Sequence, residues 1–374
     1  MVRATTDRRR RALPAAAISL TLAGSLGLTL TACGSSAPAP RPSTTSPTTA
    51  AIADARHFLG GYVDGDGRVV RRDQGGDTVS EGQAYALLLA VAANDRRRFE
   101  SIWNWTREHL QQQSGLFAYR WTNGRADPTP AADADLQTAW ALALGGEHFG
   151  EPQWTQASRQ IATAVASTEI GYDDAGKPTL AAGPWAVQQG QPTVVEPGYW
   201  TPQAATALGK LTGDHRLQAL PGADLHHLAT LTDNGSRLPP DWAQVGGGAN
   251  PRPIGARDGS APVQAGPDGL RALVWTAADP AGRTLAGRWW PLIRTTAQDA
   301  PQVWTLDGHP QQSDQAPLSA VAAAAAAHAA GDDKQRDALL DRADDIAQNF
   351  PTYYGTAWAA LGRALLTTDL LAGG

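Results

Sequence analysis

Segments of helical periodicity and similar length recur along most of the chain and limit the folds it can adopt. The predicted helices cover residues 81–94, 98–111, 133–145, 154–168, 201–212, 222–232, 268–278, 283–297, 316–330, 334–349 and 352–371. The apolar stripe of the first helix consists of Ala84, Leu87, Leu88, Val91 and Ala92. Strand-like patterns are confined to short segments such as residues 115–121. Because one helix pair cannot bury both its faces, the pairs are expected to surround a shared core, which predicts an all-α fold, an α/α barrel.

The connections between the predicted helices are rich in Gly, Pro and Trp, and Pro291 is expected to kink or break the helix over residues 283–297. In such a barrel the loops gather at the two ends, and one end becomes a groove. The informative residues at the predicted helix starts are Glu81, Asp133, Tyr199 and Asp268. The two longest loops lie around residues 171–200 and 233–267, and we expect them to form the groove walls with Trp185, Trp200 and Trp242.

The N-terminal segment has the pattern of an export signal. Arginines at residues 8–11 precede an apolar run over residues 12–32, which ends in Leu30-Thr31-Ala32-Cys33. This order resembles the lipobox of bacterial lipoproteins, in which the Cys is lipidated and becomes the new N-terminus. The alternative is an uncleaved transmembrane anchor, since the run is almost long enough to span a bilayer. The lipoprotein is favoured because the only Cys of the chain stands at the cleavage position.

Both interpretations place the rest of the chain outside the cytoplasmic membrane. Residues 34–50 consist of small, polar and Pro residues with a single Arg, so they are predicted to form a tether. We therefore divide the chain into a signal peptide over residues 1–33, a tether over residues 34–50 and a folded domain over residues 51–374.

Net charge and aromatic content narrow the classes of ligand. The formal net charge is −5, so no basic field exists to attract nucleic acid or anionic lipid. The chain has 13 Trp and only 5 Phe. Trp rings serve either as core or as flat surfaces on which the C–H bonds of sugars stack, and composition alone does not choose between these uses.

Glu81 stands at the start of the first strongly predicted helix, where a structural explanation is available. Ser80 as N-cap and Gln83 three residues later form a capping box, and Glu81 would then complement the helix dipole. The functional alternative is a catalytic carboxyl group. Local evidence by itself favours the structural explanation.

Asp133 and Asp135 open another predicted helix, where one or both can serve as cap and dipole complement. In the functional alternative one of them caps the helix while the other points into the groove. Neither has a His neighbour at a ligand spacing, and the single Cys excludes a Cys-based zinc site, so we predict no metal.

Asp268 and Arg271 are about one helical turn apart, so an ion pair on one helix face is expected. The pair either bridges the helix start or keeps Asp268 ionised and oriented, as a general base requires. Residues 246–248 are a Gly triplet without a preceding strand, and no phosphate-binding or dinucleotide-binding motif stands in a convincing context.

Taken in order, several segments resemble glycoside hydrolase family 8 along nearly the whole predicted domain. Each is weak alone, and their order is the specific signal. They are Asp66-Gly67-Arg68-Val69, Thr78-Val79-Ser80-Glu81-Gly82-Gln83, Trp103-Asn104-Trp105-Thr106, Leu116-Phe117-Ala118-Tyr119-Arg120-Trp121, Ala131-Ala132-Asp133-Ala134-Asp135-Leu136, Glu196-Pro197-Gly198-Tyr199, Pro239-Pro240-Asp241-Trp242 and Asp268 with Arg271. Tyr353-Tyr354 and, more weakly, Ser319-Ala320-Val321 resemble the branch found beside bacterial cellulose synthases.

The resemblance implies a barrel of six helix pairs, (α/α)6, and hydrolysis of a β-1,4-linked glucan with inversion at the anomeric carbon. Glu81 would be the general acid, Asp268 the general base, and Asp133 would hold the sugar in the cleaved subsite or place the water. The two catalytic carboxyls should lie ~6.5–9.5 Å apart, which leaves room for that water. No cofactor is required.

The resemblance also implies residues that contact substrate: Tyr199, Arg271, Trp121, Trp200 and Asp135. Ala132 replaces the usual hydroxyl residue, Gly198 a usual Ser, and Pro267 a usual Tyr before the base. The other functions considered are a glycan-binding lipoprotein that has lost catalysis, a purely structural helical lipoprotein, and a family enzyme for mixed-linkage glucan, xylan or chitosan. A monomer that works beside cellulose synthase machinery, anchored to the membrane through Cys33, is the expected setting.

Overall fold

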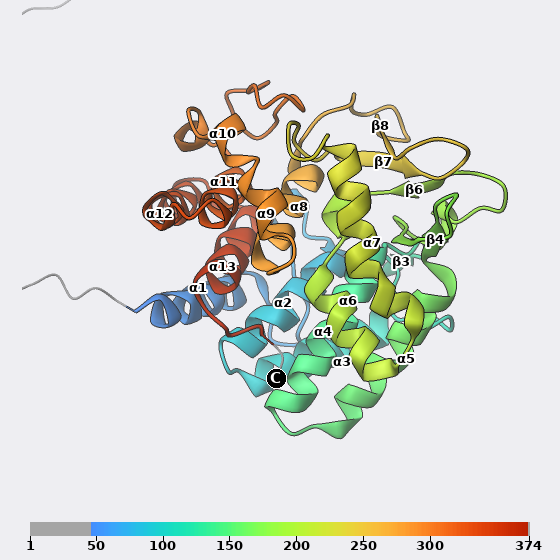
Figure 1. The fold of residues 1–374 in the computed structure, drawn as a ribbon. Coiled ribbons are helices and arrows are strands. Elements are labelled where there is room, and N and C mark those ends of the chain that lie inside the picture. The colour runs from blue at the N-terminus through green and yellow to red at the C-terminus, as the bar shows by residue number, and fades with distance from the viewer. Residues whose placement is uncertain (1–45, 373–374) are drawn as a thin grey trace, which may run out of the picture. The chain divides into compact units, whose positions relative to one another are not determined.

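Helices make up most of the computed structural model, which describes residues 46–372 (Figure 1). They are α1 (Pro47–Tyr62), α2 (Ser80–Ala92), α3 (Arg96–His109), α4 (Ala132–His148), α5 (Pro152–Thr168), α6 (Pro202–Thr212), α7 (His215–Leu231), α8 (Pro267–Ala278), α9 (Arg283–Gly287), α10 (Trp290–Ile293), α11 (Pro317–Ala329), α12 (Asp333–Asn349) and α13 (Tyr353–Thr367). The all-α prediction is confirmed. The expected signal peptide, Cys33 and the tether up to residue 45 lie outside the described residues.

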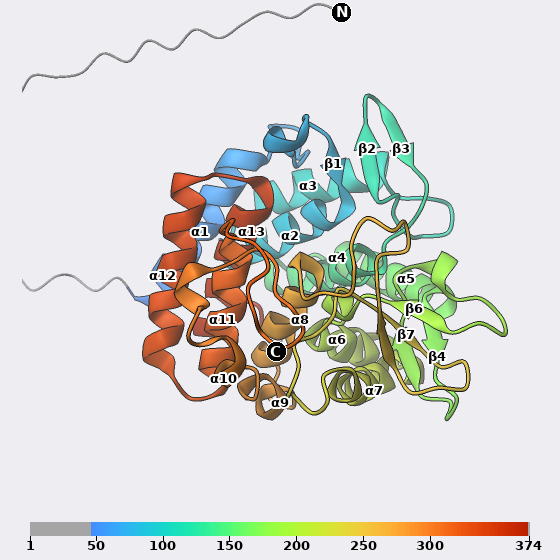
Figure 2. The ribbon, with the colours of Figure 1, turned by 90° about the horizontal axis from the view of Figure 1, so that it is seen from above.

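Two concentric rings of helices account for the helix packing within the described unit. The inner ring closes through contacts of α2 with α4, α4 with α6, α6 with α8, α8 with α11, α11 with α13, and α13 with α2. Each inner helix has an outer neighbour: α3 on α2, α5 on α4, α7 on α6, α9 on α8, α12 on α11 and α1 on α13. Figure 2 shows the last of these pairs, where the blue α1 lies beside the red α13. The arrangement is the predicted (α/α)6 barrel.

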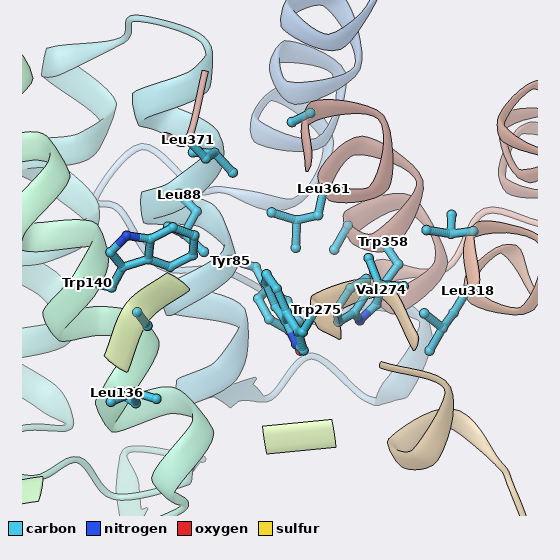
Figure 3. Close-up of a cluster of buried hydrophobic side chains, with 14 of the residues drawn as sticks. Tyr85, Leu88, Leu136, Trp140, Val274, Trp275, Leu318, Trp358, Leu361 and Leu371 are labelled. Carbon is cyan, nitrogen blue, oxygen red and sulfur yellow. The ribbon is translucent and has the colours of Figure 1, made fainter. Parts of the chain in front are cut away.

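Burial distinguishes the two rings. Almost every residue of α2 and α11 is buried, because an inner helix meets neighbours on all sides and needs apolar or small residues around its whole circumference. The stripe predicted for the first helix is therefore too narrow. The outer helices α3 and α12 bury only one face and leave charged residues exposed on the other. In the centre, Tyr85, Trp140, Trp275 and Trp358 pack among leucines from the inner helices (Figure 3).

Helix α1 corrects the predicted boundary between the tether and the folded domain. The helix begins at Pro47, four residues before the expected start, and the Ser46 hydroxyl caps it by accepting from the Thr49 N–H at 3.2 Å. Proline is favourable in a first helical turn, where no backbone N–H is needed. The Ser/Thr/Pro-rich stretch thus contains the start of a helix. Helix α1 is the outer partner of α13.

Short strands occupy the loops at the ends of the helices, and every strand pair is antiparallel. The strands are β1 (Thr78–Val79), β2 (Arg120–Thr122), β3 (Arg125–Asp127), β4 (Ile170–Tyr172), β5 (Pro178–Leu180), β6 (Thr193–Val195), β7 (Trp242–Val245) and β8 (Arg252–Ile254). The β6–β7 pairing joins the two longest loops into one wall. In the segment 115–121, which has a strand-like pattern, the strand begins only at residue 120, and it ends at residue 122.

The break expected at Pro291 is confirmed, since α9 ends at Gly287 and Pro291 lies in the first turn of the separate helix α10. Within residues 46–372, no helix combines the length and hydropathy required to cross a bilayer.

Candidate active site

Arg271 is the centre of a cluster of charged groups at one end of the inner ring. Its side chain is 2% exposed and comes from the first turns of α8. Nη1 donates to Glu81 Oε2 at 3.1 Å and to Asp133 Oδ2 at 2.9 Å, and Nη2 donates to Asp268 Oδ1 at 2.8 Å. One planar guanidinium therefore fixes carboxylates from the starts of α2, α4 and α8, a task for which its fork of donors is suited.

Further groups close the cluster around Arg271. Nη1 lies 3.2 Å from the Tyr85 hydroxyl, Nη2 lies 3.9 Å from Glu196 Oε2, and the Tyr199 ring stands 5.0 Å from the guanidinium carbon. Burial and the neighbouring Asp268 and Asp133 raise the pKa of Glu196 well above its usual range, although Arg271 opposes the shift. The raised pKa favours the neutral form of Glu196, which reduces the negative charge beside Arg271.

The start of α2 is not held by the predicted capping box. The N-cap position is Val79, without a side-chain cap, and the Ser80 hydroxyl lies 3.4 Å from the Tyr119 carbonyl. Gln83 points into the core instead, where Oε1 accepts from the Val69 N–H at 2.6 Å and Nε2 donates to Thr106 Oγ1 at 2.8 Å. The prediction of a capping box is wrong because Gln83 satisfies buried groups of the turn before α2 and of α3. Glu81 is consequently not explained by capping.

Glu81 occupies a mostly desolvated position with access to a cavity. Its side chain is 23% exposed, and the Tyr353 hydroxyl donates to Oε1 at 3.3 Å. Burial raises its pKa from 4.5 to about 7; Arg271 lowers it, while Asp133 and Asp268 raise it. A carboxyl group with this pKa is protonated in a large fraction of molecules near neutral pH, as a proton donor must be.

The side chains of Asp133 and Asp135 point to different surroundings in the structure. This agrees with part of the functional alternative, in which the two carboxyl groups have different uses. Asp133 is 2% exposed and points to Arg271, and its Oδ1 accepts from the Ala134 N–H at 2.8 Å. Asp135 is fully buried, and its Oδ1 accepts from the Phe117 N–H at 2.7 Å. Asp135 therefore fastens the loop that precedes β2. The expectation that Asp135 contacts substrate is wrong, because its carboxyl group faces Phe117 and the buried Glu169.

Asp268 has the most exposed carboxyl group of the cluster, with 40% of its side chain exposed. It is held in place by the residues at the start of α8. Pro267 occupies the first turn of α8, where a fixed φ favours the helix. Asp241 Oδ1 accepts from the Gly266 N–H at 2.7 Å and the Gly269 N–H at 2.8 Å, on either side of Asp268. Although Pro267 replaces the usual Tyr, Asp268 is thus anchored by Arg271 on one side and through Asp241 on the other.

Replacing Asp241 by Ala is expected to lower the free energy of unfolding by about 1–3 kcal/mol, because two buried N–H groups lose their acceptor. Gln264 Nε2, 3.0 Å from Asp241 Oδ2, loses its partner as well. Urea denaturation checks the value. Asp241→Asn is the matched control, since it keeps an oxygen for both N–H groups, and its loss should be clearly smaller. Equal stability of the Ala variant and the parent protein would contradict the anchoring role.

Gly198 is explained by its distance from the same helix start. A Cβ at this position would lie 1.8 Å from the Asp268 carbonyl oxygen and 3.2 Å from the Arg271 Cβ. Gly198 therefore lets the 3-10 turn Pro197–Tyr199 pack directly on α8. The replacement of the usual Ser by Gly accompanies this close approach.

The aromatic residues expected to stack on substrate have different locations. Trp200 is 4% exposed, and its Nε1 donates to the Leu180 carbonyl at 3.0 Å, so its predicted stacking role is wrong. Trp121 is half-buried on β2, with its ring edge-on to Trp105, and its stacking role stays a prediction. Trp185 and Trp242 are half-buried with ring centroids 6.5 Å apart, in one apolar cluster with Tyr199. They are the better candidates for sugar contacts on that wall.

Glu81 and Asp268 both line a cavity of about 450 Å³. Its wall also includes Asp73, Gln74, Pro267, Leu270, Gln302, Gln315, Ala316, Pro317, Leu318, Ile346, Phe350, Thr352, Tyr354 and Gly355. A more enclosed, mostly apolar pocket beside Trp200 has about 90 Å³ and lies apart from the charged cluster. Of these two cavities, the larger one is lined by carboxyl groups of the charged cluster.

The structure brings Glu81, Asp133, Asp268, Tyr199 and Arg271 together, as the sequence predicted, and adds groups that it did not assign. The additional groups are Tyr85, Glu196, Asp241, Tyr353 and Tyr354. Glu196 and Asp241 belong to the segments 196–199 and 239–242, which were singled out from the sequence for other residues. The sequence therefore contained a signal for both. Within residues 46–372, no group of three or more His, Cys, Asp or Glu side chains has the arrangement of a metal site.

Comparison with known proteins identifies relatives of this chain. The family model described as "Glycosyl hydrolases family 8" matches residues 45–367. The "Probable endoglucanase" of Novacetimonas hansenii is 30% identical over 201 residues, which cover 50% of this chain and 56% of that protein. The chain thus spans about half the length of the curated relatives it matches.

Solved structures share the fold at lower identity. The endo-beta-1,4-glucanase CMCax from Acetobacter xylinum superposes with a TM-score of 0.71 and 24% identity, covering 85% of this chain and 97% of that one. A Beta-1,3-1,4-glucanase from Paenibacillus sp. X4 superposes with a TM-score of 0.74 and 17% identity, covering 87% and 94%. These likenesses establish the common architecture.

Proposed function

Because the chain belongs to family 8 of the glycosyl hydrolases, we propose that it cleaves a β-1,4-linked glucan within the chain, with inversion at the anomeric carbon. Glu81 is the general acid, Asp268 the general base, and Asp133 holds the sugar or the water at the cleaved bond. The observation that carries the proposal is the single guanidinium of Arg271, which binds all three carboxylates. It sets them in a fixed relation beside the cavity.

The acid step uses the environment of Glu81. As the bond between C1 and the glycosidic oxygen breaks, the Glu81 carboxyl transfers its proton to that oxygen and the leaving chain departs as an alcohol. A carboxyl group kept protonated by desolvation is suited to this role. Arg271 then stabilises the Glu81 carboxylate that remains, since Nη1 lies 3.1 Å from Oε2.

The base step takes place on the opposite face of the sugar. Asp268 accepts a proton from a water molecule whose oxygen attacks C1, so the new C1–O bond has the opposite configuration. The ion pair with Arg271 at 2.8 Å orients the Asp268 carboxylate for this step. Asp268 finishes protonated and Glu81 ionised, and proton exchange with solvent restores both groups.

The pH dependence follows from the state that each carboxyl requires. Because Glu81 must be protonated and its pKa is raised to about 7, kcat/KM is expected to fall as the pH rises through about 7. Initial rates on cellohexaose, a neutral substrate, between pH 4 and pH 9 check this expectation. An alkaline limb that persists unchanged in Glu81→Gln would assign it to another group.

The substrate is tested by a panel of soluble polysaccharides. The curated relatives are named endoglucanases, which supports a β-glucan as the substrate. Reducing ends released from carboxymethylcellulose, mixed-linkage glucan, xylan and chitosan by the purified full chain rank the candidates. Faster cleavage of xylan or chitosan than of either glucan would overturn the proposed substrate, and no cleavage of any of them would favour a glycan-binding protein without catalysis.

We also propose that the protein is a monomeric lipoprotein, held outside the cytoplasmic membrane through Cys33, which trims glucan beside a cellulose-synthesising machinery. The arginines at residues 8–11, the apolar run and the single Cys support the anchor, and the Tyr353-Tyr354 motif supports the setting. Replacing Cys33 by Ser should abolish incorporation of labelled palmitate. Unchanged labelling of the Ser variant would contradict lipidation at Cys33.

A further inference from the structure

The cavity that contains Glu81 and Asp268 extends over surfaces that the proposed chemistry does not use. Gln302 and Gln315 line it from the loop before α11, and Phe350 lines it from the end of α12. All three side chains are exposed. A ligand that reaches the catalytic pair and fills the rest of the cavity therefore touches these residues too.

Phe350 is the most exposed large hydrophobic side chain among residues 46–372, at 67%. It follows the last turn of α12, whose Ile346 is buried at 1% exposure, and Pro351 succeeds it. Leaving a Phe ring in water forgoes roughly 1.5–3 kcal/mol of burial free energy. A flat ring kept in this position, on the wall of an active-site cavity, offers its face to an apolar surface of a ligand.

Side-chain amides are among the polar groups that line the same cavity as this ring. Gln74, Gln302 and Gln315 are exposed there, and Gln315 is fixed because Nε2 donates to the Asp299 carbonyl at 3.2 Å. An amide presents both a donor and an acceptor, as paired hydroxyl groups require. No Lys or Arg belongs to the described lining of this cavity, and the only carboxyl group besides the catalytic pair is Asp73, which accepts from the Tyr353 N–H at 3.0 Å. The chemistry fits a neutral polyol with an apolar ring face.

We propose that Phe350 is the stacking platform of a further glucosyl subsite, in which Gln302 and Gln315 hydrogen-bond the sugar hydroxyls. The inference rests on the proposed function. It adds the place at which a longer glucan chain is held beyond the cleaved bond. The C–H bonds on one face of the pyranose pack against the face of the Phe350 ring, which is a flat apolar surface. Longer cello-oligosaccharides then bind more tightly than those too short to reach Phe350.

Calorimetric titration of the full chain carrying Glu81→Gln, with cellotetraose and with cellohexaose, tests the subsite without turnover. Adding Phe350→Ala should weaken cellohexaose binding by about 3–10-fold, the effect expected for one aromatic contact. It should also reduce the affinity gained between the two lengths. Adding Phe350→Trp, which keeps a larger flat ring, should retain or increase that gain.

The matched control is Tyr172→Ala in the same background. Tyr172 is an aromatic side chain on β4, 48% exposed, that does not line the cavity, so its removal should leave both affinities unchanged. Equal affinity of the Phe350→Ala variant and its parent for cellohexaose would overturn the subsite while leaving the proposed function in place. Absence of cello-oligosaccharide binding by the Glu81→Gln parent would instead overturn the proposed function, and the subsite with it.

Discussion

Replacing Glu81 by Gln is expected to lower kcat on carboxymethylcellulose by about 10²–10⁴-fold, the share that general acid catalysis contributes. The Gln amide has nearly the same shape but cannot give up a proton to the leaving oxygen. The fold should be retained. Because the pKa of Glu81 is about 7 when folded and near 4.5 when unfolded, the folded state favours the protonated carboxyl. Its ionisation therefore costs stability as the pH rises from about 4.5 to about 7, and Gln removes this cost.

The thermal unfolding midpoint of Glu81→Gln at pH 7 should accordingly equal or exceed that of the parent protein. Glu100→Gln is the matched control, since Glu100 lies exposed on α3, outside the cluster. It should keep full activity. Turnover by Glu81→Gln at the rate of the parent protein would remove Glu81 from the mechanism, whereas a lowered unfolding midpoint would mean that the activity loss has a structural cause.

Replacing Arg271 by Met is expected to abolish hydrolysis and to destabilise the protein by about 3–5 kcal/mol at neutral pH, the cost of leaving buried charges uncompensated. Met fills a similar volume but cannot pair with Asp133, which is 2% exposed, or with Glu81 and Asp268. Without the guanidinium these carboxylates repel one another, and the starts of three inner helices lose their common partner.

The destabilisation should depend on pH in a defined direction. Arg271 lowers the pKa values of Glu81 and Asp133, so removing it raises both. The variant then binds more protons when folded, and its stability falls further below that of the parent as the pH rises. Urea denaturation at pH 5 and pH 8 measures the difference. Arg271→Lys keeps a charge without the fork of donors and should recover part of the stability but little activity. Arg294→Met, at an exposed Arg after α10, is the control for losing a cation.

Most of the fold was predictable because helix periodicity survives in a barrel of helix pairs. Each predicted segment after residue 81 corresponds to one observed helix, or to two where Pro291 divides it. Helix α1 was missed although Ala51, Ala55, Phe58 and Leu59 recur at helical spacing and are all fully buried. The Ser/Thr/Pro composition just before it concealed the start. The pairing of the first helix with the last is a long-range contact that no local pattern encodes.

The candidate site was predictable to the extent that its residues stand at helix starts. Ring closure brings those starts to one end, which placed Glu81, Asp133 and Asp268 together on Arg271. Sequence could not tell which neighbouring polar group turns inward, because that depends on the tertiary partner. Asp135 is held by the Phe117 N–H from a distant loop. Trp200 was likewise expected in the groove, but its indole N–H donates to the buried carbonyl of Leu180.

The measurement that tests the central claim most directly is the configuration of the first product. Proton NMR of cellohexaose hydrolysis, recorded within minutes of adding the full chain, distinguishes the anomers before they equilibrate in water. If Glu81 and Asp268 act as acid and base across the sugar ring, the newly formed reducing ends appear first as the α-anomer and then mutarotate. Initial formation of the β-anomer would show that configuration is retained and would contradict the assigned mechanism.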